Sequence, residues 1–186
     1  MSMIVFPDST SPKLPEMINS GAVGVMLTDT LYCIVARADN QAAVERLFSI
    51  INRPPELPAI VLISDVSQLY DPLPAGIDPT IGDLWPGPNS VVVAAPSAPE
   101  WLRRGSAGVA YRIPSDARIL RILAETGPLL APSANPEGKE PAKSIGEADG
   151  YFGEIVDFYV DGSIAFDRSR SSMFSLTSTG DIEQIR

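Results

Sequence analysis

Short apolar runs alternate with amphipathic segments along this 186-residue chain, and that alternation constrains the fold more than any other feature. One amphipathic segment begins after Asn40, a good helix cap, and is stopped by Pro54. Its apolar stripe consists of Val44, Leu47, Phe48 and Ile51. Short apolar runs bounded by polar residues are typical of buried strands. We expect such strands at Ala22–Leu27, Cys33–Ala36, Ala59–Ile63, Ser90–Ala95 and Gly108–Ile113.

The rest of the chain continues this alternation. A helix from Ser11 to Ser20 is expected to close at Gly21, and Ser115 is expected to cap a helix that runs to Gly127. Shorter helices are expected at Ser64–Tyr70 and Asp78–Leu84, and further strands at Leu129–Ala131, Ile155–Val160, Met173–Leu176 and Ile182–Ile185.

Turn residues indicate how these elements are joined. The 18 prolines and 14 glycines fall mostly at junctions and not in one linker, so a single domain over residues 1–186 is expected. Turns such as Asp161-Gly162 and Thr179-Gly180 resemble those of hairpins, whereas the intervening helices favour crossovers. The sequence therefore predicts an α/β fold with a mixed sheet and flanking helices.

The scarcity of histidine and cysteine limits the chemistry. The chain has no histidine, which excludes Ser-His-Asp catalysis and most zinc sites, so no metal-binding residues are assigned. Its one cysteine, Cys33, forms no internal disulfide, which suits a reducing cytosol.

No apolar run reaches the length of a membrane span, and the first residues lack a basic flank and a cleavage site. We therefore expect a cytoplasmic protein without a membrane partner.

The charge balance bears on nucleic-acid binding. The net charge is −9, and the only lysines are Lys13, Lys139 and Lys143. Proteins that bind nucleic acid without sequence preference neutralise phosphates with clustered basic residues. Bulk charge therefore disfavours strong RNA binding, although local clusters such as Arg103-Arg104 remain.

Polar loops follow several of the predicted strands, which is where open α/β sheets usually bind ligands. Each loop also has a plain structural explanation. Thr28 to Thr30 resemble a helix cap, Ser133 and Asn135 a turn before Pro136, and Trp85-Pro-Gly-Pro a rigid hydrophobic corner. The loops are Leu27–Tyr32, Trp85–Ser90, Tyr111–Pro114 and Ala131–Pro136.

Arg112 is the charged residue that these patterns single out. In a strand at Gly108–Ile113, Val109 and Tyr111 share one face with Ile113, so Ala110 and Arg112 lie on the other. A guanidinium is costly to bury without an anion. The partner is either an internal Asp or Glu or a carboxylate or phosphate of a ligand, and the spacing favours neither.

In order, these segments resemble the YrdC family of L-threonylcarbamoyl-AMP synthases, in its short single-domain form. The family's "PTDTVYGL" corresponds to Leu27–Ile34, and a helix end "KGRP" to Ile51–Pro54. Further matches are "P-hydrophobic-V" at Pro58–Val61, "WPGPLT" at Trp85–Ser90, "VRVP" at Tyr111–Pro114, "PSAN" at Pro132–Asn135, "DGG" at Asp161–Ser163 and "PST-hydrophobic" at Arg170–Met173. The resemblance covers nearly the whole chain.

The resemblance implies a strongly twisted mixed α/β sheet around a concave, positively lined cavity. It also implies that ATP, bicarbonate and L-threonine react to give threonylcarbamoyl-AMP and pyrophosphate. That product would feed N6-threonylcarbamoyladenosine formation on tRNA by partner proteins. Such chemistry depends on positioning and charge stabilisation, usually with Mg²⁺ accompanying ATP, and needs no histidine or cysteine nucleophile.

The resemblance also implies residue roles. Arg112 would grip the threonine carboxylate, and Arg53 would face the ATP phosphates. For Tyr32, packing in the core is an equally good account. The residues implied for L-threonine are Thr28, Tyr32, Arg112 and Ser171, and those for ATP are Arg53, Ala131, Ser133, Asn135, Pro141 and Ser144.

Departures from the family pattern concern the phosphate site most. Ile51 stands where the family has a lysine near the triphosphate, and Leu57 stands at a second basic position. Losing such a contact costs on the order of 2–4 kcal/mol in a catalytic site. Lys139 and Lys143 are candidates to compensate. Milder departures are Leu27, Cys33 and Ser163.

Three hypotheses follow from the sequence. The favoured one is an active synthase with a modified phosphate site. The second is a diverged family member that binds nucleotide or another small molecule without synthase activity. The third is a module for binding RNA, double-stranded RNA included, which the acidic net charge disfavours.

Overall fold

The computed structural model describes residues 4–54, 59–74, 77, 81–162, 169–177 and 179–186. Within them, ten strands form one sheet in the order β1-β8-β2-β3-β7-β4-β6-β5-β9-β10. The strands are β1 Ile4–Phe6, β2 Gly24–Leu27, β3 Tyr32–Arg37, β4 Ile60–Leu62, β5 Asn89–Ala94, β6 Gly108–Arg112, β7 Leu129–Leu130, β8 Phe158–Val160, β9 Ser172–Leu176 and β10 Ile182–Gln184.

Strand directions make the sheet mixed, as the sequence predicted. β8 runs parallel to β1 and β2, β4 to β6, and β5 to β9. The other neighbouring pairs are antiparallel, and the hairpin of β9 and β10 contains the predicted turn at Thr179-Gly180. Asp161-Gly162, in contrast, joins no hairpin, because β8 and β9 lie far apart in the sheet order.

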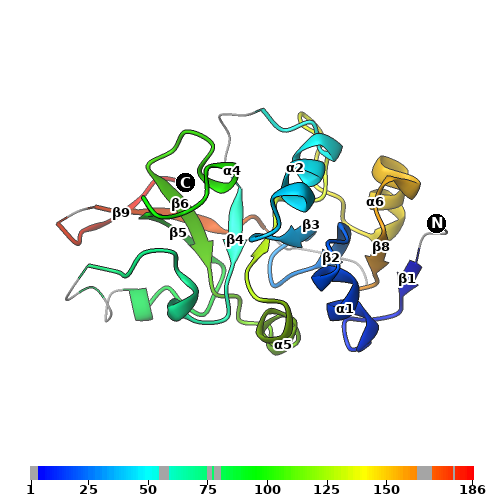
Figure 1. Cartoon of the computed structure of the whole chain (residues 1–186), viewed down its shortest axis with the longest axis horizontal. Coiled ribbons are helices and arrows are strands. Elements are labelled where there is room, and N and C mark those ends of the chain that lie inside the picture. The colour runs from blue at the N-terminus through cyan, green and yellow to red at the C-terminus, as the bar shows by residue number, and fades with distance from the viewer. Residues whose placement is uncertain (1–3, 55–58, 75–76, 78–80, 163–168, 178) are drawn as a thin grey trace.

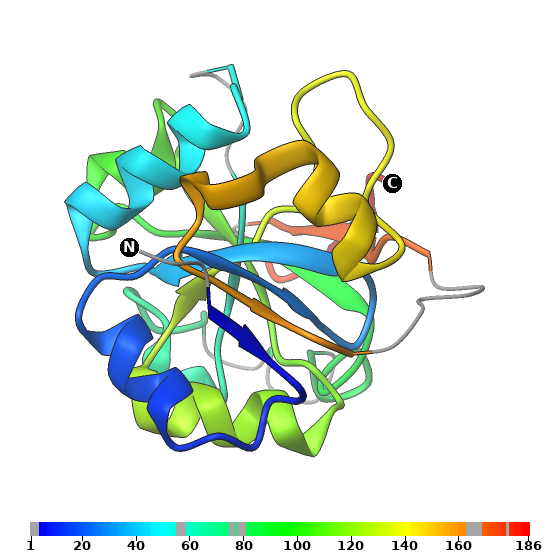
Figure 2. The same cartoon turned by 90° about the vertical axis from the view of Figure 1, so that its right-hand side faces the viewer.

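Helices cover both faces of the sheet (Figures 1 and 2). Leu14 and Ile18 of α1 and Ile122 of α5 are buried in one core cluster. Val44 of α2 and Ala148 of α6 belong to the other. The helices are α1 Lys13–Asn19, α2 Gln41–Ile50, α4 Glu100–Arg103, α5 Ala117–Thr126 and α6 Ile145–Phe152, with single 3₁₀ turns η1 Val66–Gln68 and η2 Gly153–Ile155.

Helix ends test the cap predictions. The Asn40 side chain accepts a hydrogen bond from the Ala43 N–H, so the predicted cap of α2 is confirmed. Ser115 is not the cap of α5; Asp116 is, because its carboxylate accepts from the Arg118 N–H. Thr28 caps no helix either, since Thr28 to Thr30 form the turn between antiparallel β2 and β3.

Several boundaries differ from the sequence-based ones. Only η1 forms within the helix expected at Ser64–Tyr70, and residues 78–80 of the one expected at Asp78–Leu84 lie outside the described residues, as do Leu57, Pro58 and Ser163. The short elements β1, α4 and α6 were not predicted. The Trp85 corner is confirmed: the ring is buried, and Nε1 donates to the Asn89 carbonyl at 2.8 Å.

Candidate functional site

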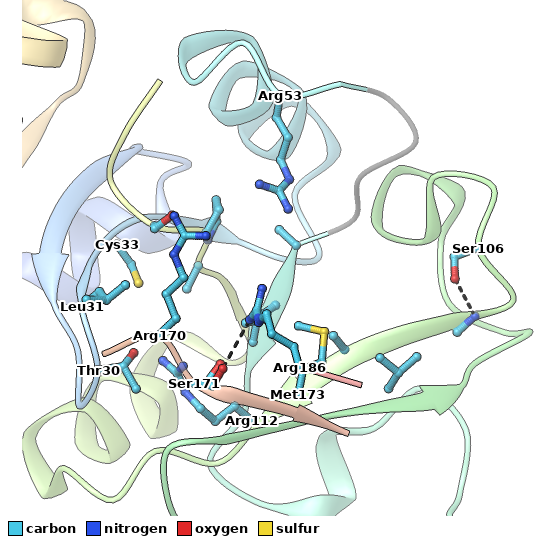
Figure 3. Close-up of a pocket in the computed structure, with 18 residues that line it drawn as sticks. Thr30, Leu31, Cys33, Arg53, Ser106, Arg112, Arg170, Ser171, Met173 and Arg186 are labelled. Atoms are coloured by element: carbon cyan, nitrogen blue, oxygen red, sulfur yellow. Dashed lines mark hydrogen bonds between the residues drawn. The ribbon is translucent and has the colours of Figure 1, made fainter. Parts of the chain in front are cut away.

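A cavity of about 240 Å³ lies between β4, β5, β6, β9 and the loop after β7 (Figure 3). Strand register forms its floor, because Ala110 of β6 pairs with both Ile60 of β4 and Val92 of β5. These three side chains and Gly108 all line the cavity. The small residues Gly108 and Ala110 of β6 therefore leave the space that a ligand needs.

Arg112 is the most buried of the cavity's arginines, at 2% exposure. It lines the cavity with Ala110, while Val109 and Tyr111 belong to the core, which confirms the predicted alternation. Its Nη2 lies 3.2 Å from Asp29 Oδ1 and donates to Thr28 Oγ1 at 3.4 Å. Its Nε is buried with no hydrogen-bond partner in the described structure. Arg112 is thus paired with an internal carboxylate, that of Asp29, and its Nε–H donor has no partner in the described structure.

Arg53 reaches the cavity because of the way α2 ends. Asn52 has a left-handed backbone (φ 52°), and the Arg53 N–H donates to the Phe48 carbonyl at 3.1 Å, which turns the chain away from the helix axis. Arg104 Nη2 donates to the carbonyls of Arg53 and Pro54 at 3.2 and 2.7 Å. The Arg104 guanidinium also lies 3.7 Å from the centroid of the Phe48 ring. Arg104 therefore holds the backbone that carries Arg53.

Positive charge is concentrated in this cavity although the chain has a net charge of −9. None of the described residues that line it is an aspartate or a glutamate. Burial lowers the pKa of Arg53; nearby Glu137 opposes this, and neighbouring arginines lower the pKa further. Such a site attracts anions. The lining arginines are Arg53, Arg112, Arg170 and Arg186.

The loop after β7 forms another wall. Ala131 and Ser133 line the cavity, and Ser133 pairs with Cys33 of β3 in an isolated antiparallel bridge. Burial raises the pKa of the Cys33 thiol, and the charge of Arg112 opposes this. The thiol is therefore protonated at neutral pH, and its place in the wall is one of packing.

The predicted site residues divide into two groups. Those that line the cavity are Arg53, Arg112, Ala131, Ser133 and Ser171. The remainder, which do not, are Thr28, Tyr32, Asn135, Pro141 and Ser144. Pro141 is half-buried in the segment that leads to α6.

The second group has structural contacts. Thr28 Oγ1 donates to the Leu31 carbonyl at 2.8 Å, which shapes the β2–β3 turn beside the cavity. Tyr32 is fully buried, and its hydroxyl accepts from the Gly162 N–H at 3.0 Å, so its packing explanation is favoured. Ser144 caps α6 by accepting from the Glu147 N–H at 3.2 Å.

Asn135 organises the loop that follows. Its amide donates to the carbonyls of Pro136 and Lys139 at 3.1 and 2.8 Å. Its Oδ1 is buried without a hydrogen-bond partner in the described structure, so one acceptor remains available. Lys139 and Lys143, the candidates for compensating cations, are exposed and do not line the cavity.

Sequence reasoning missed four polar lining residues: Thr30, Ser106, Arg170 and Arg186. Thr30 lies within a predicted ligand loop, so its position carried a signal. Arg170 begins the segment matched to "PST-hydrophobic", but that pattern has a proline there and gave the arginine no role. Ser106 and Arg186 lie in no quoted pattern. Ile51 is 2% exposed, belongs to the core and does not line the cavity.

Two features are absent from the described residues. No helix there is both long and apolar enough to span a membrane. The same part of the chain holds no group of three or more Cys, Asp or Glu side chains arranged to bind a metal ion.

Fold and cavity together define an α/β protein with a mixed sheet and a cationic cavity that suits an anionic ligand. The chain belongs to the Sua5/YciO/YrdC family, whose model, described as "Telomere recombination", matches residues 16–186. The resemblance seen in the sequence is confirmed.

Named relatives include enzymes. The chain is 30% identical over 184 residues to the threonylcarbamoyl-AMP synthase of Marinobacter nauticus, covering 92% of this chain and 96% of that protein. It is 34% identical over 164 residues to a putative threonylcarbamoyl-AMP synthase of Mycobacterium leprae, covering 86% of this chain and 74% of that one.

Solved structures share the fold. P. abyssi Sua5 complexed with L-threonine superposes with a TM-score of 0.88 at 25% identity; all of this chain is covered, but it spans only 57% of the Sua5 chain. E. coli YciO superposes with a TM-score of 0.84 at 20% identity, covering 100% of this chain and 94% of YciO. The second likeness supports the fold alone.

Proposed function

We propose that residues 1–186 act as one catalytic domain, an L-threonylcarbamoyl-AMP synthase. The observation that carries this proposal is the cavity: a deeply buried Arg112 with an unused Nε donor lies below further arginines nearer the solvent. An amino-acid carboxylate suits the buried guanidinium, and a polyphosphate suits the outer ones. The synthase names of relatives about 30% identical support the same reaction.

In the proposed reaction, the threonine amine attacks the carbon of bicarbonate, and loss of water leaves a carbamate. A carbamate oxygen then attacks the α-phosphorus of ATP, and pyrophosphate leaves. Mg²⁺ enters bound to ATP, as part of that substrate. The protein contributes positioning and neutralisation of charge, and neither step needs a protein nucleophile.

The cavity's layout supports a proposed role for several residues. Arg112 binds the threonine carboxylate, with Ser171 beside it and Thr28 supporting the guanidinium through the 3.4 Å contact. Arg53 faces the phosphates of ATP, and Ala131 and Ser133 border the nucleotide. The implied nucleotide roles of Asn135, Pro141 and Ser144 and the threonine role of Tyr32 stay predictions.

We further propose that the reaction takes place in the cytoplasm, where a single unpaired cysteine is stable. Its product would pass to partner proteins that complete N6-threonylcarbamoyladenosine on tRNA. In this scheme RNA is modified by those partners, which agrees with a chain whose net charge is −9.

The deciding experiment supplies ATP, Mg²⁺, L-threonine and labelled bicarbonate and measures threonylcarbamoyl-AMP and pyrophosphate. Formation of both products is expected. ATP binding without any product would refute synthase activity and favour the diverged nucleotide binder. Thermal stabilisation by a short RNA, but not by ATP, would favour an RNA-binding module.

Arg112→Ala tests the assignment of the carboxylate site. We expect L-threonine affinity to fall by about tenfold or more, because a charge-assisted hydrogen bond is lost, while ATP affinity changes little. Arg121→Gln is the control, because Arg121 is exposed on α5 and does not line the cavity. Equal losses of both affinities in Arg112→Ala would contradict the role of Arg112.

A further inference from the structure

Three guanidinium groups surround the more exposed part of the cavity, and they come from separate parts of the chain (Figure 3). Arg53 extends from the end of α2, Arg170 precedes β9, and Arg186 follows β10. The β9–β10 hairpin brings the last two to the same side, since Arg186 Nη2 donates to the Ser171 carbonyl at 3.4 Å. Arg170 is exposed and Arg53 is half-buried.

Among these three arginines, the Arg170 side chain is the one that stays available to a ligand. It has no hydrogen bond or salt bridge to any described residue, and no acidic side chain lines the cavity in the described structure. Its charge also acts on its neighbours: beside the larger effect of burial, Arg170 lowers the pKa of both Arg53 and Arg186. Like charges gathered in this way are unfavourable until an anion enters.

The arrangement fits a ligand with several negative charges. A lone carboxylate would satisfy one guanidinium, and Arg112 already offers a buried site for one. A chain of phosphates presents oxygens to more than one guanidinium at once, and the planar fork of arginine matches phosphate geometry. The outer arginines therefore select a polyphosphate.

Position 51 cannot contribute in the same way. Ile51 is part of the core, and the turn at Asn52 directs Arg53, not Ile51, to the cavity. Arg170 stands where the synthase pattern has a proline, so this chain carries a cation at the start of β9 and an apolar residue, Ile51, where that pattern has a lysine.

We propose that Arg170 is a polyphosphate-binding residue of this chain, supplying from the start of β9 the cation that position 51 does not provide. The proposal deepens the proposed function, since ATP is the polyphosphate there. Its test uses inorganic tripolyphosphate, whose binding does not depend on synthase activity. The role of Arg170 is thereby tested separately from the proposed function.

Arg170→Gln removes the charge and leaves a shorter polar side chain. Calorimetric titration of the full chain with tripolyphosphate is expected to give a Kd raised by about tenfold or more, because a hydrogen bond between charged groups is lost. Arg170→Lys restores the charge and should recover part of that affinity. L-Threonine affinity should stay within about twofold of wild type, because Arg112 is paired and buried separately.

Arg121→Gln, the same substitution outside the cavity, controls for the loss of net charge. It is expected to leave the Kd for tripolyphosphate within about twofold, because a distant exposed charge is screened by salt. A Kd for Arg170→Gln that matches the Arg121→Gln control, or a wild-type chain that binds no tripolyphosphate, would overturn the proposal. A wild-type chain that binds tripolyphosphate through Arg170 but forms no threonylcarbamoyl-AMP would refute the proposed function alone.

Discussion

Asp29→Asn is the sharpest test of the buried ion pair in the cavity. The substitution keeps the shape of the side chain and removes its charge, leaving the guanidinium of Arg112 with no opposite charge at 3.2 Å. Side-chain exposures of 3% for Arg112 and 5% for Asp29 limit compensation by water. We therefore expect a clear loss of stability.

The size of that loss follows from Coulomb's law. At 3.2 Å, the attraction is about 1 kcal/mol with the dielectric constant of water and about 5 kcal/mol with an effective value of about 20. The pair lies in a cavity wall, and Asp29 Oδ1 accepts no hydrogen bond in the described structure, so an intermediate value of about 3 kcal/mol is expected. For a chain of this length it corresponds to a Tm lowered by about 6–12 °C.

Urea denaturation measures this loss directly as a change in the free energy of unfolding. Asp39→Asn is the matched control, because Asp39 pairs with Arg37 at the surface and such pairs contribute about 1 kcal/mol or less. L-Threonine should stabilise Asp29→Asn more than it stabilises wild type, since its carboxylate replaces the missing charge. A loss no larger than that of Asp39→Asn would refute the argument.

Other predictions concern the supports of the site. Arg104→Ala should lower the free energy of unfolding by about 2 kcal/mol and weaken ATP binding, because two carbonyl contacts and the stacking on Phe48 are lost; calorimetry with ATP and urea denaturation check both effects. Asn40→Ala should cost about 1 kcal/mol in urea denaturation through the lost cap, with ATP affinity unchanged. Cys33 should be alkylated far more slowly than a free thiol at pH 8, because its raised pKa lowers the fraction present as thiolate. The rate of alkylation should increase as the pH rises further. Labelling at the rate of a free thiol in the folded protein would contradict its burial.

Local patterns in the sequence were sufficient for much of the fold. Apolar runs placed β2 to β6, and the helical stripe and Asn40 placed α2, because periodicity and capping depend on residues a few positions apart. The alternation of side chains along β6 also assigned Arg112 to the strand face that lines the cavity. The short elements β1 and α4 carry too few residues for a period to show.

The sequence alone therefore determined the α/β class, the mixed sheet and the role of Arg112 as a residue in need of an anion. Tertiary structure decided which charges meet. Pairing of β9 with β5 and of β10 with β9 brought Arg170 and Arg186 to the cavity, and the turn at Asn52 sent Arg53 there while Ile51 stayed in the core. The pairing of β9 with β5 joins residues far apart in the chain, so no local pattern contained it.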